Sequence, residues 1–122
     1  MKKILIIDDA LELIELTKRV LTTRGYEVVG LSDGDFALET IAKEQPDLVI
    51  IDMLLPGKDG SQICHEIKSS TAFREIPIII STGQFLDEET TSIQEGLLKA
   101  DDYLAKPFEI DDLLGKIQNL VG

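Results

Sequence analysis

Asp52 is a carboxylate placed where an apolar run of the sequence meets a loop. Residues 48–51 are all apolar and mostly β-branched, which is typical of a strand covered on both faces in a parallel sheet. Pro56, Gly57 and Gly60 follow and end the run. Ligands of open α/β sheets bind beyond the carboxyl ends of the strands, so Asp52 is a candidate site residue. On this stretch alone, an aspartate that initiates a turn is an equally good interpretation.

Polar residues also follow apolar runs elsewhere in the chain, namely Asp8, Asp9, Thr82 and Lys106. If these runs are neighbouring parallel strands, the polar residues meet Asp52 in one crevice. Three carboxylates held together repel one another unless a cation relieves them, and Mg2+ is a hard, oxygen-preferring ion that suits such a site. A carboxylate nucleophile, a metal, a hydroxyl and a lysine are the parts that phosphoryl transfer through an aspartyl phosphate requires.

The elements that would position these residues alternate between strand and helix periodicity. Apolar runs predict strands at about 3–8, 26–31, 48–52, 76–82 and 101–105. The helical pattern predicts helices at about 10–24, around 36–41, and at about 60–70, 87–98 and 110–120. The helix at 87–98 has few apolar residues, so we expect thin packing and mobility there.

Local signals predict where the first helices begin and end. We expect N-terminal caps at Asp9 for the first helix, at Ser32 with Asp33 for the second, and at Asp59 for the third. Gly25 is expected to end the first helix. The spacing of Leu13, Leu16 and Val20 predicts the face that this helix turns toward the core, and Ile14 and Leu21 widen this apolar stripe.

Strands and helices that alternate over short connections predict an α/β fold. The expected architecture is a doubly wound five-stranded parallel sheet with right-handed crossovers and helices on both faces. Of the two common strand orders, the flavodoxin-like order 2-1-3-4-5 fits a chain with five strands. Its switch point lies between the first and third strands, which end in Asp8 and Asp52. This fold would gather the carboxylates at one edge of the sheet.

The composition limits the classes of function. The 122 residues suffice for one domain with its own core, and the formal net charge of -11 argues against nucleic-acid binding through phosphate neutralisation. The apolar runs are too short for a membrane span and no signal peptide is recognisable, so we expect a cytoplasmic protein. Cys64 and His65 are each the only residue of their type. We interpret Cys64 as a buried small hydrophobe and His65 as a partly exposed helix residue.

Taken together and in this order, the polar residues resemble the receiver domains of bacterial two-component response regulators. The matching pieces are Asp8 and Asp9, Asp52 with Pro56 and Gly60, residues 81–83 and residues 101–107. Each piece is weak alone, and the set is highly specific. The resemblance implies one receiver domain over residues 1–122. The start at Met1 and the end just after the last helix favour a stand-alone, chemotaxis-regulator-like protein over a receiver cut from a longer chain.

The resemblance implies a role for each site residue. Asp52 would accept the phosphoryl group, and Mg2+ would be bound by Asp8, Asp9, Asp52 and the backbone carbonyl of Leu54. Lys106 would contact the phosphoryl group, and its bond to Pro107 would be cis. For comparison, Asp9 alone is better interpreted as a helix cap and Lys106 alone as a solvated lysine.

The resemblance also implies a conformational switch. Thr82 would be drawn to the phosphate, and Tyr103 would change rotamer with it. Together they would carry the signal to the surface formed by the helix at 87–98, the strand at 101–105 and the last helix. Taken alone, Thr82 is better interpreted as a strand-end hydroxyl and Tyr103 as a half-buried aromatic residue.

A protein of this kind would receive its phosphoryl group from a sensor histidine kinase or a histidine phosphotransfer protein and would act on a downstream target protein. It would catalyse only its own phosphorylation and dephosphorylation. One alternative is an unphosphorylated docking module, although such modules tend to have lost an acid or the lysine. Another is a metal-dependent phosphohydrolase, which usually has a second acid two residues after its nucleophile, where this chain has Ala10.

Departures from the family pattern bear on the lifetime of the aspartyl phosphate. Leu54 cannot hydrogen-bond an attacking water, whereas Gln84 could still reach it, and Gly83 leaves access to Asp52 open. Lys99 stands where a glycine is common. We therefore expect a phosphoryl group that is neither unusually short-lived nor strongly protected.

Overall fold

A computed structural model describes residues 1–83 and 100–122. Within these ranges the chain forms strands β1 (Lys3–Ile7), β2 (Glu27–Leu31), β3 (Leu48–Asp52), β4 (Ile78–Thr82) and β5 (Asp102–Ala105), and helices α1 (Leu11–Thr23), α2 (Ala37–Glu44), α3 (Gly60–Ser69) and α5 (Ile110–Val121). The strands lie in the order β2-β1-β3-β4-β5, and each neighbouring pair is parallel. The predicted doubly wound α/β fold is thus confirmed. The helix predicted at 87–98 lies outside the described residues, as do Gln84 and Lys99.

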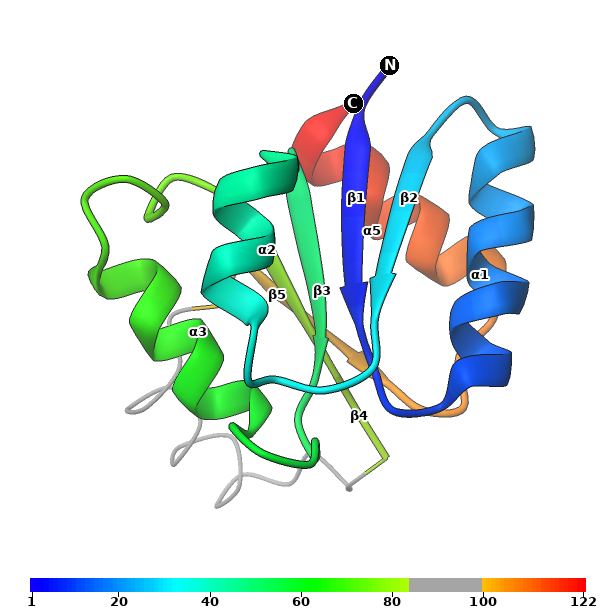
Figure 1. Ribbon diagram of the computed structural model, residues 1–122. Coiled ribbons are helices and arrows are strands. Elements are labelled where there is room, and N and C mark those ends of the chain that lie inside the picture. Colours follow the sequence, from blue (N-terminus) through cyan, green and yellow to red (C-terminus); the bar gives the residue numbers. More distant parts are fainter. Residues whose placement is uncertain (84–99) are drawn as a thin grey trace.

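The sheet forms the middle layer of the fold. Figure 1 shows α1 and α5 on one face of the sheet and α2 and α3 on the other. Strands β3 and β4 are buried over their whole lengths, because helices cover both faces. Successive strand residues enter opposite cores, so that Ile50 packs with α1 and α5 while Ile51 packs with α2 and α3. Each such side chain contributes about 1.5–3 kcal/mol by burial, which holds the strand ends in fixed positions.

Two predictions for single residues of α3 are confirmed. Cys64 is fully buried in the core on the α2 and α3 side, and His65 is exposed. None of the helices in the described ranges is long and apolar enough to cross a bilayer.

The predicted helix caps are correct for α3 and wrong for α1 and α2. Asp59 caps α3, since its Oδ1 accepts a hydrogen bond from the Gln62 N–H at 2.9 Å. The residue at the N-cap of α1 is Ala10, which places Asp9 one residue too early. Helix α2 begins at Ala37, because Asp33 instead accepts from the Asp35 N–H at 3.0 Å and closes a turn before the helix.

Helix α1 turns most of its predicted apolar stripe toward the core. Ile14 and Leu21 are buried, as predicted, and Leu13 and Val20 are half-buried. The prediction is wrong for Leu16, which is 57% exposed, and it did not include Thr17, which is buried. The predicted end of α1 is confirmed, since Gly25 follows the helix with a φ of 91°, a conformation that suits glycine.

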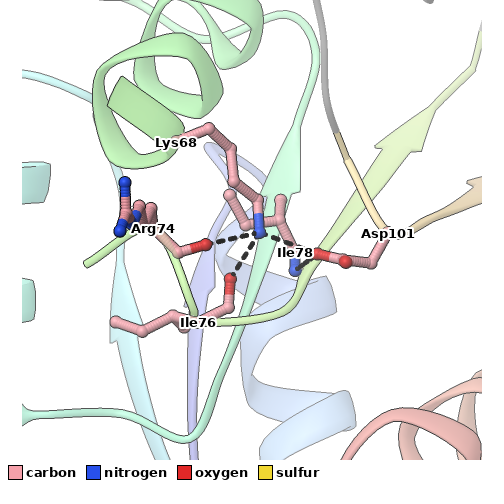
Figure 2. A network of polar contacts seen from close by, with 5 residues as sticks. All are labelled: Lys68, Arg74, Ile76, Ile78 and Asp101. Atoms are coloured by element: carbon pink, nitrogen blue, oxygen red, sulfur yellow. Dashed lines mark hydrogen bonds and ion pairs between the residues drawn. The ribbon is translucent and has the colours of Figure 1, made fainter. Parts of the chain in front are cut away.

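A polar network ties the amino ends of β4 and β5 to α3 (Figure 2). The Lys68 ammonium donates to the carbonyl oxygens of Arg74 and Ile76, at 3.2 and 2.9 Å, and to Asp101 Oδ2 at 3.0 Å. The same Asp101 oxygen accepts from the Ile78 N–H at 2.8 Å. This network fixes how the two strands enter the sheet, at the edge opposite to their carboxyl ends.

Candidate functional site

The candidate site lies at the carboxyl ends of β1 and β3, at the switch point of the sheet. Both strands are buried apolar runs, so the residue that follows or ends each run is brought to the same edge. Asp8 and Asp52 are 3% and 7% exposed, although each carries a carboxylate. Asp9 is exposed on the loop that leads into α1. Two desolvated acids beside one hydrated acid make an environment that attracts cations.

The three predicted metal ligands lie together. One carboxylate oxygen from each of Asp8, Asp9 and Asp52 lies within 4.8 Å of the others. This oxygen-only donor set, partly buried and open toward solvent at Asp9, fits Mg2+, which takes few protein carboxylates and keeps several waters. The Leu54 N–H lies 3.4 Å from Asp52 Oδ1, so the backbone of the loop after β3 runs past the Asp52 carboxylate.

Lys106 supplies positive charge to this cluster. Its Nζ lies 2.7 Å from Asp8 Oδ2 and 3.4 Å from Asp52 Oδ2. The Lys106 N–H donates to the Thr82 carbonyl oxygen at 2.7 Å, which extends the β4–β5 pairing by one bond and places the side chain. The peptide bond between Lys106 and Pro107 is cis, as predicted.

The pKa of Asp52 is raised above its ordinary value of 3.8. The largest cause is burial, which penalises the charged carboxylate, and the negative charge of Asp8 acts in the same direction. Lys106 and the Leu54 N–H oppose the rise. A more basic carboxylate is a stronger nucleophile, so the environment of Asp52 favours attack on an electrophile.

The predicted switch residues lie on β4, which pairs with the strand that ends in Asp52, and on β5, the next strand of the sheet. Thr82 is fully buried at the end of β4 and pairs in register with Ala105. Tyr103 lies on β5 opposite Ile80, and it packs, partly buried, against the core on the α2 and α3 side. Thr82 thus lies at the carboxyl end of β4, and Tyr103 lies within β5.

Sequence reasoning missed the residues that hold the loop between β3 and α3, residues 53–59. Asp35, in the loop before α2, accepts from the Lys58 N–H at 3.3 Å, and the Gly34 N–H lies 3.4 Å from the Pro56 carbonyl oxygen. Gly60 is required where the loop turns into α3, because a Cβ there would collide with the Asp52 carbonyl oxygen. The glycines and Pro56 were visible in the sequence, but nothing local connects Asp35 to a loop 23 residues later.

Comparisons with known proteins agree with this geometry. Residues 4–118 match the model of the response regulator receiver domain family. A response regulator from Chloroflexus aurantiacus is 36% identical, with a TM-score of 0.88 and coverage of 98% of this chain and 96% of that one. The response regulator TrrA from Thermotoga maritima, solved in complex with Mg(2+)-BeF, is 31% identical, with a TM-score of 0.85 and coverage of 99% and 100%. The chemotaxis protein CheY4 of Vibrio cholerae is 26% identical, with a TM-score of 0.89 and coverage of 99% of each chain.

Proposed function

The chain belongs to the response regulator receiver domain family, and on this premise we propose that it is a signalling protein switched by phosphorylation of Asp52. The observation that carries the proposal is the convergence of the carboxylates of Asp8, Asp9 and Asp52 with the ammonium of Lys106. A nucleophile, an electropositive partner and a candidate cation site therefore occupy one crevice.

In the proposed reaction, an oxygen of Asp52 attacks the phosphorus of a phosphohistidine on the donor protein. The new bond joins that oxygen to phosphorus, the phosphorus–nitrogen bond breaks, and its electron pair returns to the imidazole. Burial favours the attack because it leaves the carboxylate less solvated and more basic. Lys106 lies close enough to Asp52 Oδ2, at 3.4 Å, to contact the transferred group.

We propose Mg2+ as the cofactor, held by Asp8, Asp9, Asp52 and the backbone carbonyl of Leu54. The bound ion would neutralise negative charge on the transferring phosphoryl group. The chain's own contribution is to hold the acids in place. The Asp8 N–H donates to the Leu31 carbonyl oxygen at 3.0 Å, and Asp8 Oδ1 accepts from the Ala10 N–H at 2.9 Å.

The proposed output is a change of protein-docking surface. Thr82 at the end of β4 and Tyr103 on β5 are the proposed switch residues, because both strands end at the acceptor's edge of the sheet. The proposed partners are a sensor histidine kinase or a histidine phosphotransfer protein upstream and a target protein downstream. The proposed location of the protein itself is the cytoplasm. The only chemistry proposed is self-phosphorylation and self-dephosphorylation.

Intact mass spectrometry after incubation with acetyl phosphate and Mg2+ tests this function. We expect one added phosphoryl group on the native chain, no addition when the metal is chelated beforehand, and none on Asp52→Asn. Circular dichroism checks that the variant is folded. A folded native chain that gains no phosphoryl group would favour the alternative, a receiver fold that docks on its partner without phosphorylation.

A further inference from the structure

Ser81 carries a buried hydroxyl group that the proposed mechanism leaves unused. The residue is 2% exposed, and its Oγ has no hydrogen-bond partner among the described residues. Its backbone is hydrogen-bonded, since the Ser81 carbonyl oxygen accepts from the Met53 N–H at 2.9 Å. Buried hydroxyl groups are nearly always paired, since an unpaired one costs folding free energy. The Ser81 hydroxyl therefore does not stabilise the fold, and its presence needs another explanation.

The register of the sheet places Ser81 beside the acceptor. Ser81 is the Cα partner of Asp52 on one side and of Leu104 on the other. Side chains alternate between the faces of a strand, and Ile50 and Ile79 both enter the core under α1 and α5. Asp52 and Ser81, two residues further along their strands, therefore project toward the same face, on strands about 4.8 Å apart.

The same face carries the ammonium partner of the site. Leu104 belongs to that core, and Lys106 lies two residues beyond it. Ser81 thus stands between the strand that ends in Asp52 and the strand that leads to Lys106. Asp8 joins them, since it follows Ile6 by two residues and Ile6 also belongs to this core.

Asp52 has room for another hydrogen-bond donor. Its Oδ1 accepts from the Leu54 N–H at a long 3.4 Å, and its Oδ2 forms an ion pair with the Lys106 ammonium, also at 3.4 Å. An ionised carboxylate offers about four acceptor positions. A neighbouring hydroxyl without a partner can turn toward such a position by rotation about one bond.

Building on the proposed function, we propose that the Ser81 hydroxyl donates a hydrogen bond to the Asp52 carboxylate as that carboxylate leaves phosphorus. In this step a water oxygen forms a bond to phosphorus, and the bond from phosphorus to the Asp52 oxygen breaks. The electron pair stays on Asp52, and both protons of the water leave with inorganic phosphate as H2PO4−. Negative charge grows on Asp52 during the step, so the hydrogen bond strengthens in the transition state and accelerates dephosphorylation.

The test is the first-order rate at which phosphorylated protein loses its phosphoryl group in Mg2+ after the donor is removed. Ser81→Ala should lose it about tenfold more slowly than the wild type, the effect expected of one hydrogen bond to a charged group. Ser81→Thr keeps the hydroxyl and should keep the wild-type rate. Thr17→Val, which removes another buried hydroxyl, on α1, should also leave the rate unchanged.

Two further measurements separate this role from a structural one. Ser81→Ala should have a urea midpoint no lower than that of the wild type, because it removes an unpaired group. In urea, the unfolded phosphoproteins should lose phosphate at equal rates. An equal or faster native rate for Ser81→Ala, or a marked loss of stability, would overturn the inference. If the wild type takes up no phosphoryl group, the proposed function itself fails; if it does and the Ala variant matches it, only the Ser81 inference fails.

Discussion

At the scale of residues, the site is defined by an excess of negative charge. The carboxylates of Asp8, Asp9 and Asp52 cluster together, and the Lys106 ammonium contacts two of them, those of Asp8 and Asp52. Like charges at these separations disfavour the folded state unless a cation offsets them. The acids at this edge of the sheet therefore weaken the fold as long as no cation neutralises them.

Replacing Asp9 by asparagine should separate the charge repulsion between the acids from the stabilisation that a bound cation gives. Without metal, Asp9→Asn should raise the free energy of unfolding by about 0.5–1 kcal/mol, because one repelling charge is removed. The increase in melting temperature that Mg2+ gives the wild type should be lost, because that increase comes from binding to the native state. Thermal unfolding in EDTA and in Mg2+ measures both. Glu15→Gln, an exposed acid on α1, is the control and should respond to Mg2+ as the wild type does. An equal response by Asp9→Asn would remove Asp9 from the proposed ligands.

The raised pKa of Asp52 predicts a pH dependence of stability in the absence of metal. In the folded state Asp52 keeps its proton to a higher pH than its ordinary value of 3.8, so the native state binds more protons than the unfolded state in that window. Stability therefore falls as the pH rises from about the ordinary value through the raised one.

The variant Asp52→Asn lacks this titration. Its free energy of unfolding relative to the wild type should increase as the pH rises through the window and should then level off. Urea unfolding in EDTA at several pH values measures the difference. A difference in free energy of unfolding, variant minus wild type, that is independent of pH or decreases as the pH rises would contradict the assigned direction of the pKa.

The sequence predicted the acids and the lysine because each follows a strand, and parallel strands deliver their ends to one edge. It could not predict that the Ser81 hydroxyl would have no partner in residues 1–83 and 100–122, because that depends on the register with β3 and β5. Asp35 was missed for a similar reason, since its contact with Lys58 joins two loops that only the fold brings together.

At the scale of elements, the two edges of the sheet have different tasks. The carboxyl edge carries the repelling acids, whereas the amino edge carries the Lys68 network (Figure 2). The Lys68 side chain is only 13% exposed and satisfies two carbonyl oxygens and a carboxylate. The hydrogen bonds of Lys68 at the amino ends of the strands thus offset the repulsion between the acids at the carboxyl ends.

Lys68→Met should therefore destabilise the fold and leave the chemistry intact. The methionine keeps the apolar stem but removes the Lys68 donor from the two carbonyl oxygens and from Asp101, which keeps only the Ile78 N–H, at a cost of about 1–3 kcal/mol. Urea unfolding measures the loss, and the phosphorylation rate with acetyl phosphate should stay at the wild-type value under folding conditions. Lys18→Met, which changes an exposed lysine on α1, is the control and should leave stability unchanged. A wild-type unfolding midpoint for Lys68→Met would show that the network adds nothing.

The boundaries of the elements were less predictable than their existence. Asp59 was recognised as a cap because it directly precedes its helix, whereas Asp9 and Asp33 lie too early. Side chains such as Asp33 can bond to nearby backbone in a turn as readily as to a helix end, and the sequence does not reveal which one forms.

At the scale of the whole molecule, the alternation of strand and helix patterns was sufficient to predict the order of the sheet. Right-handed crossovers and short connections leave few topologies open to five strands. The resulting fold places the candidate site at the carboxyl ends of the strands and the Lys68 network at their amino ends (Figures 1 and 2). With a formal net charge of -11, the molecule favours partners that offer basic or apolar surfaces.

The most direct test of the account asks which residue carries the phosphoryl group. The protein is treated with acetyl phosphate and Mg2+, reduced with borohydride, which converts an aspartyl phosphate into homoserine, and then digested for tandem mass spectrometry. The account predicts homoserine at position 52 alone, and none when the metal is chelated first. An unchanged Asp52 in protein that has gained a phosphoryl group, or homoserine at another aspartate, would contradict it.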